Sequence, residues 1–236
     1  MNGQAICAPI AAMSLHQITA TRGEPGLRLR FAHEIAQLRI VEDRMKSEQA
    51  LALATDLHHH DRRQDEPYIN HPLRVALRII CHYNVLNADV ISAALLHDTV
   101  EDHADRLSTE GRQDALHVLA DQFGPRVAAL VSAVTNPAYD LNRDKHAQYA
   151  EHVVTALVQN PWARVIKVSD FTDNAVGLHY TAGAKAARLA RRYAPLVPTL
   201  QDLVDLPDTP LTADVKDHIR HQLNRAADRC ARARGR

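Results

Sequence analysis

The stretch AALLHDTVED, residues 93–102, joins an apolar helical run to a cluster of ionisable side chains. His97 is a strong donor for a first-row divalent metal, and Asp98 adds a hard oxygen ligand. Glu101 and Asp102 follow within about one helical turn and are residue types used in acid–base catalysis. Adjacent helical residues point about 100° apart, so His97 and Asp98 can share one ion only where the helix ends or bends. The stretch predicts a buried helix that carries a polar site at its end.

Helices are also predicted on both sides of this stretch. Asn87 or Asp89 can cap the helix that runs to His97, and Pro72 suits the first residue of the preceding helix. Further helices are predicted over residues 30–57, 112–121, 125–134, 143–159, 162–178, 183–204 and 212–236, with loops over 58–67 and 103–111. The helix over 183–204 is expected to be interrupted near Pro195 or Pro198. Since no strand alternation is evident, we expect an all-α domain of about eight to ten helices.

Composition supports this fold class and limits the partners. Apolar residues make up 46% of the chain, aromatic residues only 4%, and glycine occurs eight times, which favours helices. The formal net charge of +0 predicts no general attraction to nucleic acid or membrane. The three cysteines are scattered and form no CxxC pair, and the short apolar run over residues 5–15 lacks the charged start of a signal peptide. We therefore expect a cytoplasmic protein.

The predicted organisation has three parts. Residues 1–27 are expected to form an irregular N-terminal tail, because glycine and proline recur there. Residues 28–206 are expected to form the helical domain that carries the site. Residues 207–236 follow a break at Pro207 and Pro210 and are expected to form a C-terminal helix that packs on the domain or extends from it.

Two distant residues can complete a metal site with His97 and Asp98. His71 lies at a predicted helix start, and Asp170 lies in an apolar helical stretch that would carry it inward. Two histidines and two aspartates suit Mn²⁺, Fe²⁺, Co²⁺ or Zn²⁺ better than Ca²⁺. Taken singly, these residues are better explained as helix caps, cap neighbours or surface groups, so the metal interpretation depends on all four belonging to one pattern.

The order His…His-Asp…Asp resembles the signature of the HD superfamily of metal-dependent phosphohydrolases. Over residues 35–200 the chain resembles, more narrowly, the RelA/SpoT-type hydrolase domain and the free-standing small alarmone hydrolases, such as the metazoan SpoT homologue. The segments that carry the resemblance are RRQDEPYINHPLRVA (62–76), AALLHDTVED (93–102) and KVSDFTDN (167–174), with a weaker similarity over 187–196.

The resemblance implies an HD-domain helical bundle and a stringent-response enzyme. It implies one Mn²⁺, or another first-row divalent metal, with the ligands His71, His97, Asp98 and Asp170. It implies that Glu101 and Asp102 orient and deprotonate the attacking water. The implied activity is that of a guanosine-3′,5′-bis(diphosphate) 3′-pyrophosphohydrolase, which converts (p)ppGpp to GDP or GTP and pyrophosphate.

Four residues are expected to hold the nucleotide. The resemblance implies that Arg62 packs on the guanine ring with Arg63 close by, and that Asn174 contacts the sugar. Lys167 lies about one helical turn before Asp170 and is a candidate phosphate contact. In the same loop, Glu66 and Tyr68 are expected mainly to maintain loop structure. The run His58-His59-His60 matches no ligand of the family and is expected to be a solvated loop.

One departure from the family affects the substrate. The basic residue expected after the last metal ligand is Phe171 here, and Asp173 adds a negative charge that would disfavour a polyphosphate. Alternatives therefore stay open: a hydrolase of (p)ppApp or another phosphorylated nucleotide, and an inactive protein that binds alarmone. The length leaves no room for a synthetase domain, so a dedicated hydrolase is expected; a homo-oligomer is left open.

Overall fold

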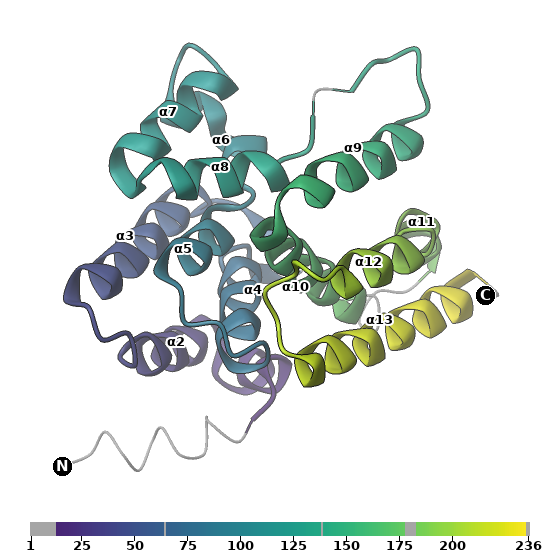
Figure 1. The fold of residues 1–236 in the computed structure, drawn as a ribbon, viewed down its shortest axis with the longest axis horizontal. Coiled ribbons are helices and arrows are strands. Elements are labelled where there is room, and N and C mark those ends of the chain that lie inside the picture. The colour runs from purple at the N-terminus through teal and green to yellow at the C-terminus, as the bar shows by residue number, and fades with distance from the viewer. Residues whose placement is uncertain (1–12, 64, 138, 178–182, 235–236) are drawn as a thin grey trace. The chain divides into compact units, whose positions relative to one another are not determined.

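The computed structural model describes residues 13–63, 65–137, 139–177 and 183–234, and these residues are predominantly helical (Figure 1). This confirms the all-α prediction. The helices are α2 (Leu15–Ile35), α3 (Val41–Leu57), α4 (Asn70–Cys81), α5 (Ala88–Leu96), α6 (Thr99–Leu107), α7 (Arg112–Phe123), α8 (Pro125–Val134), α9 (Lys145–Gln159), α10 (Pro161–Gly177), α11 (Gly183–Tyr193), α12 (Leu196–Asp205) and α13 (Ala213–Arg234). Within the described ranges, no helix combines the length and apolarity needed to cross a membrane.

The chain divides into two compact units between Thr135 and Asn136. The first unit contains α2 to α8, and the second contains α9 to α13. The sequence had indicated no division at this position. The predicted domain limits at residues 28 and 206 stay predictions.

Two buried helices, α4 and α5, form the centre of the first unit (Figure 1). Helix α4 packs on α2 and α5, while α5 also packs on α3 and α8. Seven consecutive residues, Val90–Leu96, are buried on α5, as expected for a helix that is apolar on every side. Asn87 caps α5 by accepting a hydrogen bond from the Val90 amide at 3.2 Å, as predicted. The buried α5 therefore ends at the polar stretch that begins with His97.

The predicted irregular tail is wrong for its second half. Helix α2 begins at Leu15, where Ser14 and Gln17 form a reciprocal capping box. Gly23 adopts φ 60° and breaks the helical geometry locally, but the helix resumes after it. Buried apolar residues on α2 supply packing energy that outweighs the local breaking tendency of glycine and proline. The first 12 residues of the predicted tail lie outside the described residues.

Two other helix limits differ from the sequence prediction. The single helix predicted over residues 30–57 is divided, because α2 ends at Ile35 and α3 begins at Val41. The loop predicted over 103–111 is wrong in its first half, since α6 extends to Leu107. Within α6, His103 departs from helical geometry with φ −137° and ψ 31°. A short two-stranded antiparallel sheet, β1 (Arg62–Arg63) and β2 (Glu66–Pro67), also lies in the predicted loop over 58–67.

In the second unit, α10 packs on α9, α12 and α13. The buried side chain of Arg164, near the start of α10, contacts the loop that contains Asp208 and Thr209. The Arg164 side chain donates to the Leu157 carbonyl at 2.6 Å and to the Val158 carbonyl at 2.6 Å. It also donates to Thr209 Oγ1 at 3.0 Å and pairs with the Asp208 carboxylate. Only 1% of Arg164 is exposed, so its charge depends on these four partners.

Replacing Arg164 with Met should destabilise the second unit by about 2–4 kcal/mol, because it removes the four polar contacts of a buried guanidinium, which include its ion pair with Asp208. Thermal or urea unfolding followed by circular dichroism measures this loss. Arg225→Met is the matched control, since Arg225 is an exposed arginine of the same unit. A loss no larger than that of the control would contradict the structural role of Arg164.

A candidate metal centre at the end of helix α5

His97 and Asp98 occupy the junction between α5 and α6. His97 is the C-cap of α5, and Asp98 is the N-cap of α6. The helix therefore ends where His97 and Asp98 must lie if they are to bind the same ion. The Nδ1 atom of His97 lies 2.9 Å from the Ala94 carbonyl oxygen, which can only accept, so Nδ1 carries the proton. The Nε2 atom then faces Asp98 Oδ2 at 3.0 Å, and it can donate a lone pair to a metal once it has lost its proton.

His71 approaches the same pair from the first turn of α4. Its side chain is buried, and its Nε2 atom lies 3.7 Å from Asp98 Oδ2. The imidazole rings of His71 and His97 have centroids 5.1 Å apart and are inclined by 68°. Three predicted ligands thus converge within the first unit, although 26 residues separate the two histidines in sequence.

Tyr68 also belongs to this site, which the sequence analysis missed. Its hydroxyl donates to Asp98 Oδ2 at 2.7 Å. Burial raises the pKa of Tyr68, and the Asp98 carboxylate raises it further, so the hydroxyl keeps its proton and remains a donor. The expected role in loop structure is therefore incomplete, because Tyr68 holds one oxygen of Asp98. Its only signal in the sequence was its position three residues before His71.

The Asp98 carboxyl group is kept ionised by its neighbours. Burial raises its pKa, but the imidazoles of His97 and His71 and the Tyr68 hydroxyl outweigh that effect and hold the pKa well below its usual range. An ionised carboxylate beside two buried imidazoles is a suitable donor set for a divalent first-row metal. The residues present therefore fit the metal that the sequence pattern predicted.

Glu101 and Asp102 lie in the first turn of α6, about one turn beyond Asp98. The Asp102 amide donates to the Asp98 carbonyl at 2.9 Å, so the backbone connects the two acidic residues. Burial and the carboxylates of Asp98 and Glu101 raise the pKa of Asp102 to about 6. A carboxylate with a pKa near neutrality is better matched to general-base catalysis than an ordinary aspartate. By accessible surface Asp102 is an exposed residue, so solvent screens a large part of this repulsion.

The raised pKa predicts that Asp102 destabilises the metal-free protein at neutral pH. The folded state binds the Asp102 proton more tightly than the unfolded state does, so this cost is present above about pH 6 and disappears below pH 4. After allowance for solvent screening, Asp102→Asn should stabilise the chelator-treated protein by about 0.5–1 kcal/mol at pH 7.5. The gain should vanish at pH 4.

Urea unfolding at the two pH values measures this difference. Asp105→Asn serves as the control, because Asp105 is an exposed aspartate on the same helix. A destabilised Asp102→Asn protein at pH 7.5 would show that the carboxylate is not held under repulsion.

The loop before His71 is organised by Glu66. Its carboxylate accepts two hydrogen bonds from Arg74, at 2.8 and 2.9 Å, and one from Asn70 at 3.0 Å. This agrees with the structural role expected for Glu66. On the paired strand, Arg62 is exposed and donates to the Asp65 carbonyl at 2.7 Å, and Arg63 is half-buried. The structure therefore presents both predicted base-binding arginines on one short hairpin.

The remaining predicted site residues lie on α10 in the second unit. Asp170 is buried, and both of its oxygens have partners on the same helix. Asn174 donates to Oδ1 at 2.6 Å, and the Lys167 ammonium lies 3.2 Å from Oδ2. The helical spacing of these three residues agrees with the prediction. Asp173, the departure from the family pattern, is 1% exposed, so its carboxylate lies within the interior of the protein.

The second unit also contains a basic pocket that the sequence did not indicate. Its cations are held near aromatic rings: Lys145 Nζ lies 4.8 Å from the Tyr139 ring centroid, and Arg192 Cζ lies 4.8 Å from that of Tyr149. The lining residues are Tyr139, Lys145, Tyr149, Arg188, Leu189 and Arg192. These residues come from α9, α11 and the segment before α9, so only folding brings them together.

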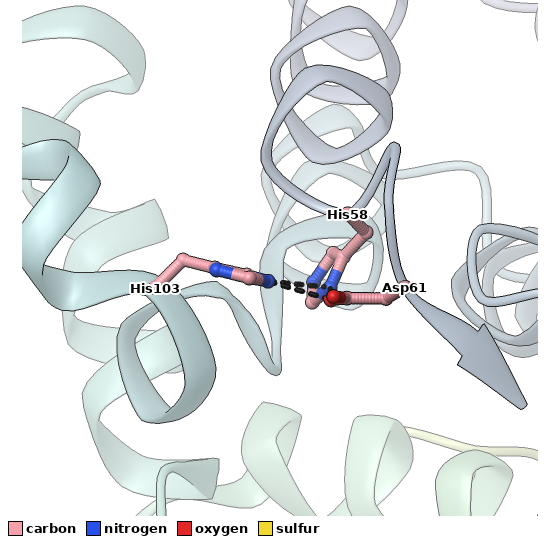
Figure 2. A group of neighbouring side chains, drawn as sticks. All are labelled: His58, Asp61 and His103. Atoms are coloured by element: carbon pink, nitrogen blue, oxygen red, sulfur yellow. Dashed lines mark hydrogen bonds and ion pairs between the residues drawn. The ribbon is translucent and has the colours of Figure 1, made fainter.

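The expectation for the run His58-His59-His60 is wrong for its first member. His58 is buried, whereas His59 and His60 are exposed as predicted. The His58 ring stacks on Tyr68 with a centroid distance of 4.5 Å. Its other neighbours are Asp61 and His103 (Figure 2). An apolar partner surface, supplied by Tyr68, explains why this histidine leaves solvent.

Comparison with known proteins supports the geometry. A model described as "HD domain" matches residues 50–196, which include the three convergent candidate ligands and Asp170. The chain belongs to the HD domain family. HD-domain membership together with the His and Asp donors indicates a divalent metal centre.

The chain is also similar to curated proteins whose names refer to (p)ppGpp metabolism. The bifunctional (p)ppGpp synthase/hydrolase SpoT of Escherichia coli K12 is 33% identical over 177 residues, covering 71% of this chain and 24% of SpoT. The guanosine-3′,5′-bis(diphosphate) 3′-pyrophosphohydrolase of Aquifex aeolicus is 32% identical over 143 residues, covering 59% of this chain and 19% of that protein. This chain thus spans about a fifth of the length of these longer relatives.

For a shorter relative and for a solved structure, the match covers a larger share of the other protein than it does for the longer relatives. The guanosine-3′,5′-bis(diphosphate) 3′-pyrophosphohydrolase MESH1 of Danio rerio is 35% identical over 121 residues, which is 50% of this chain and 60% of that protein. A solved structure described as a metazoan ortholog of SpoT that hydrolyzes ppGpp has a TM-score of 0.54 and 25% identity. The match covers 80% of this chain and 96% of that one.

Proposed function

We propose that this HD protein is a divalent-metal-dependent (p)ppGpp 3′-pyrophosphohydrolase. The observation that carries the proposal is the convergence of His71, His97 and Asp98, with Asp102 one helical turn away. The names of the relatives supply the substrate class. The overall reaction breaks the bond between the 3′-oxygen and phosphorus: the water oxygen becomes part of pyrophosphate, and the 3′-oxygen gains a proton and leaves as the 3′-hydroxyl of the nucleotide.

We propose Mn²⁺ as the metal and His71, His97, Asp98 and Asp170 as its ligands. The mixed nitrogen and oxygen donors support this choice. The cation, when bound, supplies Lewis-acid polarisation of water and of the phosphoryl oxygens. Tyr68 holds Asp98 in position by its hydrogen bond, and the Ala94 carbonyl keeps the His97 lone pair directed at the site.

Glu101 and Asp102 have the proposed role of orienting the attacking water and accepting its proton. The raised pKa of Asp102, caused by burial and by the neighbouring carboxylates, supports the assignment. An inactive alarmone-binding protein would have no use for a carboxylate held under this repulsion. A hydrolase is therefore the better interpretation of the site.

The nucleotide contacts are proposed from two regions. Arg62 and Arg63 are assigned to the base, since a guanidinium plane can stack on a purine. Asn174 is assigned to the sugar and Lys167 to a phosphate, as the resemblance and its spacing suggested. We add Arg188 and Arg192 of the basic pocket as candidate phosphate contacts, because they lie with Lys145 beside aromatic rings. The scattered cysteines support a cytoplasmic location.

The test is a hydrolysis assay with purified protein. With Mn²⁺ present, the protein should release pyrophosphate from ppGpp, and EDTA should stop the release. A parallel reaction with ppApp tests the adenine alternative. If metal-loaded protein binds ppGpp without cleaving it, the inactive alarmone-binding alternative replaces this proposal; if it neither binds nor cleaves either nucleotide, the substrate class is wrong.

A further inference from the structure

A second group of side chains that could hold a metal ion lies in the first unit, apart from the candidate ligands described above. His58 Nδ1 lies 2.8 Å from Asp61 Oδ2, and His103 Nε2 lies 2.7 Å from the same oxygen. The two ring nitrogens are 3.1 Å apart. Figure 2 shows the three side chains pointing toward one another, two from the end of α3 and the turn after it and one from α6. Three potential ligand atoms therefore meet at one place.

The distances between these atoms suit one bound cation. At a metal–ligand distance of about 2.1 Å, neighbouring ligands of an octahedral ion lie about 3.0 Å apart, and those of a tetrahedral ion about 3.4 Å apart. The observed separations of 2.7, 2.8 and 3.1 Å match one face of an octahedron. Two histidines and one carboxylate on one face form a known donor set for first-row divalent metals.

The local structure positions each of the three side chains. His58 is fully buried at the C-cap of α3 and is held by stacking on Tyr68. Asp61 follows in a tight turn, because its amide donates to the His58 carbonyl at 3.0 Å. His103 lies at the one non-helical position within α6, where the backbone departs from the helix. The side chains of Asp61 and His103 are 35% and 16% exposed, which leaves an approach from solvent.

The cluster also lies beside the acidic residues of the first site. Tyr68 stacks on His58 and donates to the Asp98 carboxylate, and Asp102 directly precedes His103 in the chain. Neighbouring carboxylates favour a cation at the cluster.

We propose that His58, Asp61 and His103 bind a second first-row divalent cation, separate from the one at His71, His97 and Asp98. The three protein ligands occupy one face, and water or another oxygen ligand occupies the remaining positions. Tyr68 connects the two sites, because its ring stacks on His58 while its hydroxyl holds Asp98. The second cation would therefore lie on the other side of Tyr68 from Asp98.

Metal counting tests this proposal without any nucleotide. Chelator-treated protein is equilibrated with Co²⁺, freed of excess metal and analysed by mass spectrometry. Wild type should retain two equivalents, the double variant Asp61→Asn/His103→Gln one, and Asp98→Asn one. His60→Gln, an exposed histidine beside the cluster, is the matched control and should retain two. A single equivalent in wild type, or two in the double variant, would overturn the proposal.

Anomalous diffraction from Co²⁺-loaded wild-type crystals gives an independent result. A second peak should lie about 2.1 Å from His58 Nδ1, Asp61 Oδ2 and His103 Nε2. This measurement does not depend on the folding of any variant, and an empty cluster in a crystal with metal at His97 refutes the site. Absence of ppGpp hydrolysis would refute the proposed function but leave this result unaffected.

Discussion

Asp98→Asn should remove both the metal bound at His71 and His97 and the hydrolytic activity. The substitution keeps the size of the side chain and an acceptor for Tyr68, but it removes the negative charge that two imidazoles stabilise. We expect the loss of metal affinity to exceed the roughly 10- to 100-fold effect typical of residues that only support a ligand. Activity should fall to background, because the metal supplies the Lewis acid.

Metal content by mass spectrometry and pyrophosphate release measure the two effects on one preparation. Asp105→Asn is the matched control, since it removes an exposed carboxylate from the same helix. Near-normal turnover of Asp98→Asn would exclude this aspartate from the metal centre.

Asp102→Asn and Glu101→Ala should retain the metal and lose turnover. Neither residue is needed to hold the cation, but each is assigned to the attacking water, and loss of a general base costs about 10²- to 10⁴-fold. The effect should appear in kcat rather than in metal content. If either variant turns over normally, the assignment of that residue is wrong.

The pH profile distinguishes a base from a merely structural carboxylate. A base must be ionised, so wild-type turnover should fall as the pH drops through the pKa of Asp102. That pKa is about 6 without metal, and a bound cation lowers it, so the acid limb should lie at or below pH 6. Asp102→Asn should lose this limb while keeping its metal. If the pH profile of Asp102→Asn is unchanged, the fall in activity at low pH is caused by another ionisable group.

Much of the fold was predictable because its signals are local. Apolar spacing identified the helices over 112–134, and Asn87 caps the helix it was expected to cap. The errors arose where packing overrode a local signal. Helix α2 continues past Gly23 because several of its residues are buried in the core. Helix α6 extends to Leu107, where Arg106 donates to the Asp56 and Leu57 carbonyls at the end of α3.

The site was predictable to a similar extent. His71, His97 and Asp98 were expected to converge, and within the first unit they do. The run of three histidines shows the limit, since only His58 is buried and nothing in its own segment distinguishes it from His59. Lys167 is another case, because its contact with Asp170 depends on side-chain geometry that spacing alone leaves open.

The sequence by itself determined the helical fold class, the family and the identity of the candidate ligands, because these depend on residue type and on spacing within short segments. Only the tertiary structure decided that Tyr68 holds Asp98 across 30 residues, that His103 meets His58 across 45, and that Arg164 reaches Asp208 across 44. Such contacts depend on how whole helices pack, and packing is the sum of many small burial terms. A short sequence pattern therefore does not predict these contacts.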